Sequence, residues 1–318
     1  MAMNMLQFQK GLSMNDFFER FGSEYQCREY LEQARWPKGF VCPKCNSHKH
    51  CVVWHGEQKT FQCDDCRTQT TLTSGTIFQS TKLPIVKWFQ AMFFLTQSKN
   101  NVSALELTRL LGICYRSAWR LKHKIIQTMC ERESNRRLHG NVQLDDAYLG
   151  GENSGGKAGR GSENKVPFLA ALETNTDGHP TNAIFQKIDA FTKLDVKKWA
   201  EKHICVGTVV TSDGLGCFNA LSEAGLKHNK IVVGAGNKST DMACFNWVNI
   251  VLGNLKTAIS GTYHAFRFDK YAHRYLAEVQ YRFNRRVDMS VMLDRLAYAL
   301  VQTTARPEAW LRTAEAQR

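Results

Sequence analysis

The sequence has no long uninterrupted run of apolar residues. Its longest, residues 85–95, is broken by Lys87 and Gln90, whereas a membrane-spanning helix needs about 20 apolar residues. Residues 1–11 also lack the hydrophobic core of a secretion signal. These absences exclude a membrane-spanning protein and predict a cytoplasmic location.

Acidic residues are scarce relative to basic ones. The chain has 42 Lys and Arg against 29 Asp and Glu, a net charge of +13, which favours a polyanionic partner and most simply nucleic acid. A hydrophobic share of 43% and a charged share of 22% exclude a disordered or fibrous chain. We see no internal repeat, and a chain of this length is expected to form about two or three domains.

Apolar spacing predicts helices in the first part of the chain and strands in the second. Residues 13–33 are expected to form one helix that begins with a capping box of Ser13 and Asp16. A further helix is expected after Pro84. Residues 102–111 and 115–129, separated by a short turn at Gly112, have the helix-turn-helix pattern. Strands are expected at 142–149, 166–173, 181–188, 208–211 and 230–233, and helices at 191–204, at 217–224 and, as a set of three, from 245 onward.

Two Cys-x-x-Cys pairs are the strongest local pattern. Cys42 and Cys45 form the first pair, Cys63 and Cys66 the second, and 17 residues separate them. Disulfides are not expected in a reducing compartment, and four thiolates supply the tetrahedral site that Zn²⁺ accepts. We therefore predict a structural zinc ribbon.

The alternatives are four unrelated thiols or a redox pair. Other residues between the pairs could serve as ligands: Cys51, His48, His50 and His55. The cysteines outside the ribbon are expected to be small buried apolar side chains: Cys27, Cys114, Cys130, Cys205, Cys217 and Cys244.

The second helix of the helix-turn-helix carries a basic stripe. Arg116, Arg120 and Lys124 recur every four residues and so share one helix face. Such a stripe suits phosphates or base edges in a DNA major groove. A solvated helix face without a ligand is the alternative interpretation.

Two carboxylates stand where buried strands rarely carry them. Asp145 lies within a strand of apolar character, and Asp213 follows the end of another. On neighbouring strands they could share a divalent cation such as Mg²⁺, which prefers oxygen ligands. Asn249 on a later helix could supply a third ligand, with Lys256 two turns further along the same face. Alternatively, Asp145 and Asp146 could simply flank a turn. Asp213 could likewise only form a turn or cap a helix, and Asn249 could be an ordinary helix residue.

Two neighbouring acids complete this hypothesis. Asp241 is the nearest alternative third ligand. Asp146 is expected to point away from Asp145, because side chains alternate along a strand.

Taken together, these motifs resemble the ISXO-like bacterial insertion-sequence transposases, over nearly the whole chain. The resemblance rests on residues 35–45 (RWPKGFVCPKC), the second cysteine pair, the helix-turn-helix and residues 144–151 (LDDAYLGG). It continues in residues 261–264 (GTYH) and 273–286 (HRYLAEVQYRFNRR). The family motif has Asp-Glu where this chain has Asp145 and Asp146, and its commoner third ligand is Glu, where this chain has Asn249.

The resemblance implies a multidomain chain with a ribonuclease H-like α/β catalytic domain. The predicted domains are an N-terminal helical segment (1–38), a zinc ribbon (39–80), a helix-turn-helix domain (81–135) and a catalytic domain with C-terminal helices (140–318). The family's active site, carried over by motif, falls on Asp145, Asp213, Asn249 and Lys256.

The implied activity is DNA strand cleavage and strand transfer with two Mg²⁺ or Mn²⁺ ions. Asp145 would bridge both ions, Asp213 and Asn249 would each hold one, and Lys256 would contact DNA. The implied partners are the terminal inverted repeats of the element, target DNA and further copies of the chain, in the nucleoid of a bacterial cell. A structure-selective nuclease, a DNA-binding regulator without catalysis and an inactive transposase remain as alternatives.

Overall fold

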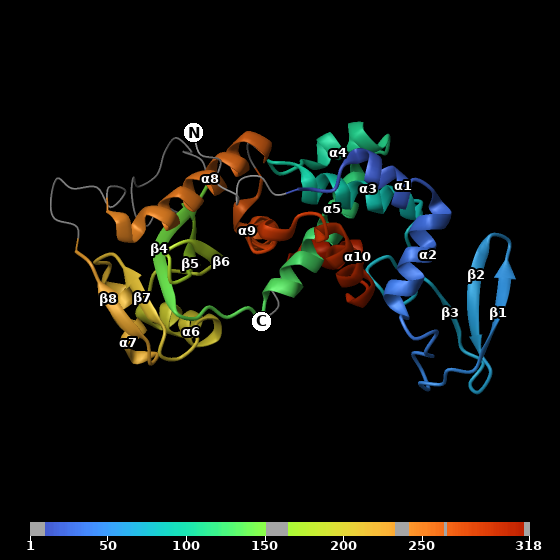
Figure 1. Ribbon diagram of the computed structural model, residues 1–318, viewed down its shortest axis with the longest axis horizontal. Coiled ribbons are helices and arrows are strands. Elements are labelled where there is room, and N and C mark those ends of the chain that lie inside the picture. The colour runs from blue at the N-terminus through green and yellow to red at the C-terminus, as the bar shows by residue number, and fades with distance from the viewer. Residues whose placement is uncertain (1–9, 151–164, 233–241, 264–265, 315–318) are drawn as a thin grey trace. The chain divides into compact units, whose positions relative to one another are not determined.

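A computed structural model describes residues 10–150, 165–232, 242–263 and 266–314 (Figure 1). The chain forms two compact units. Unit 1 comprises Met1–Thr128 and Val287–Arg312, and unit 2 comprises Met129–Arg286 and Thr313–Arg318. The described helices include none long and apolar enough to cross a membrane.

Unit 1 contains a group of helices and a small antiparallel sheet. The helices are α1 (Met14–Phe21), α2 (Glu24–Arg35), α3 (Ile85–Gln97), α4 (Ala104–Leu111), most of α5 (Tyr115–Glu133), α10 (Met292–Gln302) and most of α11 (Glu308–Thr313). The sheet has the order β1 (His50–His55), β2 (Gln58–Cys63), β3 (Gln69–Thr71).

The predicted single N-terminal helix is two helices in the structure. The capping box of Ser13 and Asp16 is confirmed at the start of α1. The chain then breaks at Gly22, and Ser23 forms a second capping box with Gln26 at the start of α2. Apolar spacing alone does not reveal this break, because both helices bury residues of the same spacing.

The helix-turn-helix is formed as predicted. α4 ends at Gly112, whose φ of 62° places it in the left-handed region that favours glycine at the end of a helix. α5 begins three residues later and is longer than predicted, extending to Glu133.

From residue 245 onward the described chain forms four α-helices instead of the predicted three. The first two remain in unit 2, but α10 and most of α11 belong to unit 1 with the N-terminal residues, not to the catalytic domain predicted at 140–318. α10 packs against α2 and α3 and buries Leu293 and Leu296 completely. On its polar side, Asp294 accepts hydrogen bonds from Arg20 at 2.6 Å and Tyr30 at 2.7 Å. The amphipathic pattern of α10 shows that it is covered, but not by which part of the chain.

Unit 2 is built on a five-stranded sheet. Its order is β6 (Pro180–Lys187), β5 (Val166–Thr174), β4 (Asn141–Leu149), β7 (Val209–Ser212), β8 (Lys227–Lys230). β4, β5 and β6 are antiparallel neighbours, whereas β4, β7 and β8 run parallel. This order and these directions are those of the ribonuclease H-like fold, which confirms the predicted fold class.

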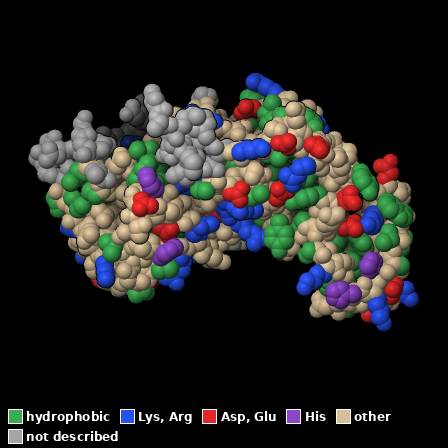
Figure 2. Space-filling view, viewed as in Figure 1, with side chains coloured by type: hydrophobic (Ala, Val, Ile, Leu, Met, Phe, Trp, Pro, Cys, Tyr) green, Lys and Arg blue, Asp and Glu red, His purple; other side chains and the backbone are tan. Residues whose placement is uncertain are grey.

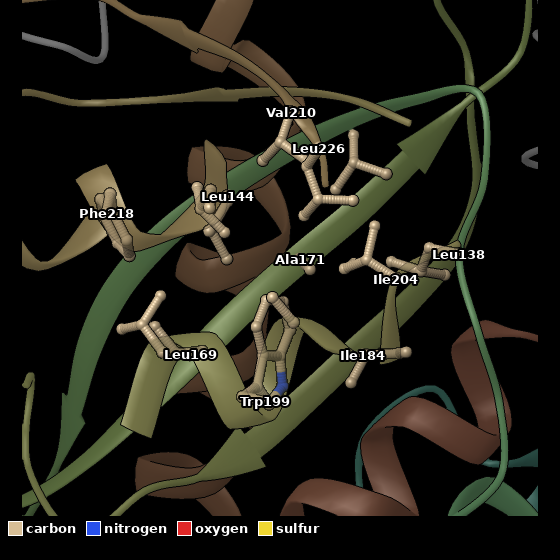
Figure 3. Close-up of a cluster of buried hydrophobic side chains, with 14 of the residues drawn as sticks. Leu138, Leu144, Leu169, Ala171, Ile184, Trp199, Ile204, Val210, Phe218 and Leu226 are labelled. Carbon is tan, nitrogen blue, oxygen red and sulfur yellow. The ribbon is translucent and has the colours of Figure 1, made fainter. Parts of the chain in front are cut away.

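Helices cover both faces of this sheet. They are α6 (Lys193–His203), α7 (Ala220–Glu223), α8 (Asn246–Tyr263) and α9 (Phe268–Phe283), with short 3-10 helices η2 (Gly216–Asn219) and η4 (Ala243–Phe245). A third 3-10 helix, η5 (Arg286–Asp288), follows α9. One core lies between the sheet and α6, where Trp199 packs over Leu169 and Ile184 (Figure 3). The second core joins the other face to α8 and α9. Alternate residues of β4 and β5 enter the two cores, as expected for a central strand covered on both sides.

The last strand was predicted at the wrong place. β8 occupies Lys227–Lys230, whereas residues 230–233 were expected. The apolar run that suggested the later position begins only where the strand ends. β8 is an edge strand with mostly exposed polar residues, and so it lacks the alternation that identifies a strand.

Candidate functional site

The four ribbon cysteines converge on one point. Sγ atoms lie 3.5 Å apart for Cys42 and Cys66, 3.5 Å for Cys45 and Cys63, and 3.4 Å for Cys45 and Cys66. A tetrahedral zinc ion with Zn–S bonds of 2.3 Å requires about 3.8 Å between sulfurs. The donor set therefore fits Zn²⁺. Within the described residues, this group includes no histidine and not Cys51.

The backbone preorganises each cysteine pair. The carbonyl of Cys42 accepts from Asn46 N at 2.9 Å, and that of Cys63 accepts from Arg67 N at 3.0 Å. Asn46 and Arg67 have φ values of 60° and 57°, so each turn closes through a left-handed residue. Hydrogen bonds from the Thr68 side chain and amide lower the pKa of Cys66, whereas hydrogen bonds to the neighbouring thiols raise the pKa of Cys45.

Three carboxylates meet at one edge of the unit 2 sheet. One oxygen each of Asp145, Asp146 and Asp213 lies within 4.8 Å of the others. β7 ends at Ser212, which pairs with Leu144 of β4. The end of β7 therefore places Asp213 beside the next residues of β4, because the carboxyl ends of parallel strands meet at the same edge.

The prediction that Asp146 points away from the site is wrong. Alternation holds for its apolar neighbours, since Leu144 faces the α6 core and Ala147 the α8 core. Past Ser212, however, β4 has lost the hydrogen-bonded neighbour that β7 provided. Carboxylates on both faces of β4 can therefore bend round this open edge toward Asp213. Alternation sets the direction of each Cα–Cβ bond, but it does not keep the carboxylate oxygens of Asp145 and Asp146 apart.

The crowding of these carboxylates affects the pKa of Asp145. Burial, followed by repulsion from Asp146 and Asp213, raises the pKa of Asp145 to about 6. The backbone N–H of Asp146 donates to Asp145 Oδ1 at 2.9 Å, and this hydrogen bond and Lys256 act in the opposite direction. A divalent cation would remove the repulsion, and three carboxylates are hard oxygen donors. The donor set fits Mg²⁺ or Mn²⁺.

Asp213 is held in place by its neighbours. Its Oδ1 accepts from Leu215 N at 3.0 Å, an Asx-type turn. The Ser212 hydroxyl donates to the backbone carbonyl of Asp213 and lies 2.8 Å from His228 Nε2. His228 escaped the sequence analysis because β8 was predicted at residues 230–233.

α8 brings the remaining predicted residues to the Asp145 face of the sheet. Gln143, two residues before Asp145 on β4, accepts from Val248 N in the first turn of α8 at 3.0 Å. Asn249 is half-buried, and its amide nitrogen donates to Phe245 O at 3.0 Å, which directs its donor side to the helix backbone. Lys256 is exposed and near enough to affect Asp145. Gln143 was not predicted.

The predicted basic stripe on α5 is not a continuous exposed surface. Arg116 and Arg120 bind Glu308 of α11 at 3.2 and 2.5 Å. Lys124 is only 6% exposed and donates to Ile77 O at 2.6 Å, so it does not add its charge to the exposed face of α5. The face shown in Figure 2 has Lys and Arg side chains interspersed with acidic ones.

Asp241, the alternative third ligand, lies outside the described residues.

Residues 137–284 match the family model of the ISXO2-like transposase domain, and residues 22–69 match that of the transposase zinc-ribbon domain. The chain carries a transposase zinc ribbon and an ISXO2-like transposase domain. The resemblance to ISXO-like transposases is thereby confirmed. The transposase domain contains all three clustered aspartates, and the zinc-ribbon match contains all four cysteines.

Individual relatives are more distant. A protein of Halobacterium salinarum, described as an uncharacterized protein in transposable element ISH50, is 27% identical over 195 residues, which cover 60% of this chain and 61% of the relative. The chain thus spans about three fifths of the length of this curated relative.

Two solved structures were also found. The catalytic core domain of BIV integrase matches with a TM-score of 0.27 and 18% identity, covering 44% of this chain and 80% of that one. A simian T-cell lymphotropic virus intasome in complex with PP2A regulatory subunit B56 gamma matches with a TM-score of 0.28 and 12% identity. This match covers 55% of this chain and 63% of that one. Such low scores add nothing to the fold assignment, which rests on the sheet order.

Proposed function

We propose that this chain is a DNA transposase that cleaves and joins DNA strands at the terminal inverted repeats of its own element. The observation that carries the proposal is the convergence of Asp145, Asp146 and Asp213 within 4.8 Å, inside the segment that matches a transposase domain. Carboxylates placed so close together repel one another, and a cation site explains their arrangement.

The proposed roles follow the positions of the side chains. Asp145 and Asp213 hold divalent cations, with Asn249 Oδ1 as a further ligand. When bound, the ions would supply a deprotonated attacking oxygen and stabilise the leaving oxygen of an in-line displacement. Lys256, exposed beside Asp145, contacts the DNA phosphate. Gln143 fixes the first turn of α8 against β4 and so positions Asn249 relative to Asp145.

Asp146 extends the donor set beyond the residues predicted from the family motif. Its carboxylate lies within the cluster, and its backbone N–H holds Asp145 Oδ1. We propose that Asp146 is a positioning residue whose charge adds to the affinity of the site for the cation.

Recognition of the repeats is assigned to unit 1. The zinc ribbon and the helix-turn-helix present Arg116 and other basic side chains to DNA, and Arg116 is 73% exposed. Because two element ends must be joined, we propose that a dimer or larger assembly of this chain acts on DNA.

A cleavage assay tests the proposal. Purified protein is incubated with Mg²⁺ or Mn²⁺ and DNA ends taken from the flanks of its gene. Nicks at a defined end are expected for the wild type. Asp145→Asn is expected to lower the cleavage rate by about a thousandfold or more, with repeat binding retained.

Asp189→Asn is the matched control. Asp189 is exposed in unit 2 on the segment between β6 and α6, so the substitution removes one carboxylate without touching the cluster. Full cleavage by Asp145→Asn would exclude this active site. Repeat binding by the wild type without any cleavage would favour a DNA-binding regulator or an inactive transposase, and cleavage of branched DNA without end specificity would favour a nuclease.

A further inference from the structure

Unit 1 contains a pocket of about 430 Å³ that the proposed function does not use. Its walls come from the loop after Phe78, from α3, from the first half of α5 and from the residues at the start of α11. The volume lies within the range of small-ligand sites. Its charged residues are Lys82, Arg120, Lys124, Arg306 and Glu308, four cations against one acid.

Lys124 is the central observation. Its side chain is 6% exposed, and Nζ donates to the carbonyls of Ile77 at 2.6 Å and Gln79 at 3.3 Å. Two carbonyls use two of the three ammonium hydrogens and supply only partial negative charge. The protonated form of Lys124 is destabilised there, because burial, followed by repulsion from Arg120, lowers its pKa to about 8.

Glu308, the acidic residue of the pocket, already forms ion pairs with arginine side chains. Glu308 accepts from Arg116 and Arg120 within unit 1, and also from Arg312 one turn later in α11. The pKa of Glu308 is lowered to about 2 by hydrogen bonds from Arg116 and Arg312, so it remains ionised. Since three guanidinium groups share this one carboxylate, Lys124 has no carboxylate partner among the residues that the structure describes.

We propose that this pocket binds a phosphate group. A dianion between Lys124 and the arginines supplies the missing negative charge, and charge-assisted hydrogen bonds of this kind are the strong ones. The hydroxyl groups of Ser80 and Ser117 also line the pocket and suit phosphate oxygens. The phosphate is carried either by a small molecule or by the DNA backbone, and the second source rests on the proposed DNA binding.

The chain offers a matched pair of variants. Lys124→Met removes the buried charge at nearly constant length. Lys122→Met removes another buried lysine of α5, which donates to Val102 O and does not line the pocket. Arg306→Gln, at the other wall, is a second pocket variant if Lys124→Met fails to fold.

The first measurement is calorimetric titration of the full chain with inorganic phosphate and, separately, with a deoxynucleoside monophosphate. Lys124→Met and Arg306→Gln are expected to weaken phosphate binding by about tenfold or more, the loss typical of a charged hydrogen bond. Lys122→Met is expected to bind as the wild type does. Absence of phosphate binding in the wild type, together with equal duplex binding by both pocket variants and the wild type, would overturn the proposal.

The second measurement separates the two sources. Binding of a DNA duplex is followed by fluorescence anisotropy over a series of salt concentrations. If the backbone supplies the phosphate, Lys124→Met weakens duplex binding and lowers the salt slope by about 1, and free phosphate competes. If a small molecule supplies it, Lys124→Met loses only the small ligand. Neither readout requires cleavage, so failure of the active-site proposal would be seen separately in the Asp145 assay.

Discussion

At the scale of single residues, the charge of Asp145 opposes folding. The pKa of this carboxyl is raised from 3.8 to about 6 by burial and by its two acidic neighbours. A folded state that raises the pKa of an acid binds its proton more tightly than the unfolded chain does. The stabilisation of the folded state by this bound proton is complete below the pKa of Asp145 in the unfolded chain, and it is lost as pH rises through about 6.

Asp145→Asn is therefore expected to stabilise the metal-free protein above pH 6. A shift of about two pKa units corresponds to at most about 3 kcal/mol, and the gain should disappear near pH 4. Urea unfolding at pH 4 and pH 8, without added divalent cations, measures it. Asp189→Asn should show no such pH-dependent gain, and an equal effect of both variants would contradict this account of Asp145.

Two residues show what spacing can and cannot predict. The spacing of Arg116, Arg120 and Lys124 correctly gives one face of α5, but Lys124 is buried because the loop after Phe78 packs over it. Cysteine burial was likewise predicted from residue type, and Cys114 is exposed. Burial of a polar or reactive side chain depends on segments distant in sequence, which the local pattern does not contain.

At the scale of elements, the zinc ribbon has very little apolar core. Its buried cluster consists of Phe40, Cys42, Phe61 and Cys63, with Phe40 and Phe61 stacked at 4.9 Å. Half of that cluster is made of the proposed zinc ligands. A core of this size cannot offset the conformational entropy of about 30 residues, so metal binding must supply most of the stability of this element.

Removal of zinc is therefore expected to unfold the ribbon selectively. A chelator should release a single zinc ion per chain, and hydrogen exchange should accelerate in β1 and β2 while β4 and β5 keep their protection. Metal quantification and hydrogen-exchange mass spectrometry measure the two effects. Cys63→Ser should reproduce the loss, whereas Cys51→Ser should leave zinc content unchanged. Retained protection of β2 after complete zinc release would contradict the prediction.

Strands with buried apolar residues, including the edge strand β6, were predictable from sequence, and the exposed edge strand β8 was not. β4 and β5 were found within a residue of their true bounds because buried central strands have strong apolar patterns. β8 was misplaced and Asp146 was assigned to the wrong side, both where a neighbouring strand is missing. The candidate site was predicted in its main acids, but the contacts of Gln143 and His228 arise from pairings that no local motif encodes.

At the scale of the whole molecule, unit 1 is assembled from both ends of the chain. Leu296 of α10 is completely buried, in a helix that packs against α2 and α3. The stability of unit 1 should therefore depend on residues far away in sequence. For example, the Gln97 side chain donates a hydrogen bond to Met289 O, 192 residues later in the chain.

Leu296→Ala is expected to destabilise unit 1 by about 2–5 kcal/mol. The cavity should reduce hydrogen-exchange protection in α2 and α3 and leave the strands of the unit 2 sheet unchanged. Leu194→Ala, at a leucine of α6 that is 61% exposed, is the control and should have little effect. Loss of protection only in β4 and β5 would show that the C-terminal helices stabilise the catalytic domain instead.

This two-ended unit has a consequence for biosynthesis. Arg20 leaves the ribosome 274 residues before its partner Asp294, and the entire transposase domain is translated in between. The apolar faces of α2 and α3 that α10 covers therefore stay exposed until α10 has been synthesised and has left the ribosome. A prematurely terminated polypeptide that lacks α10 therefore leaves unit 1 incomplete.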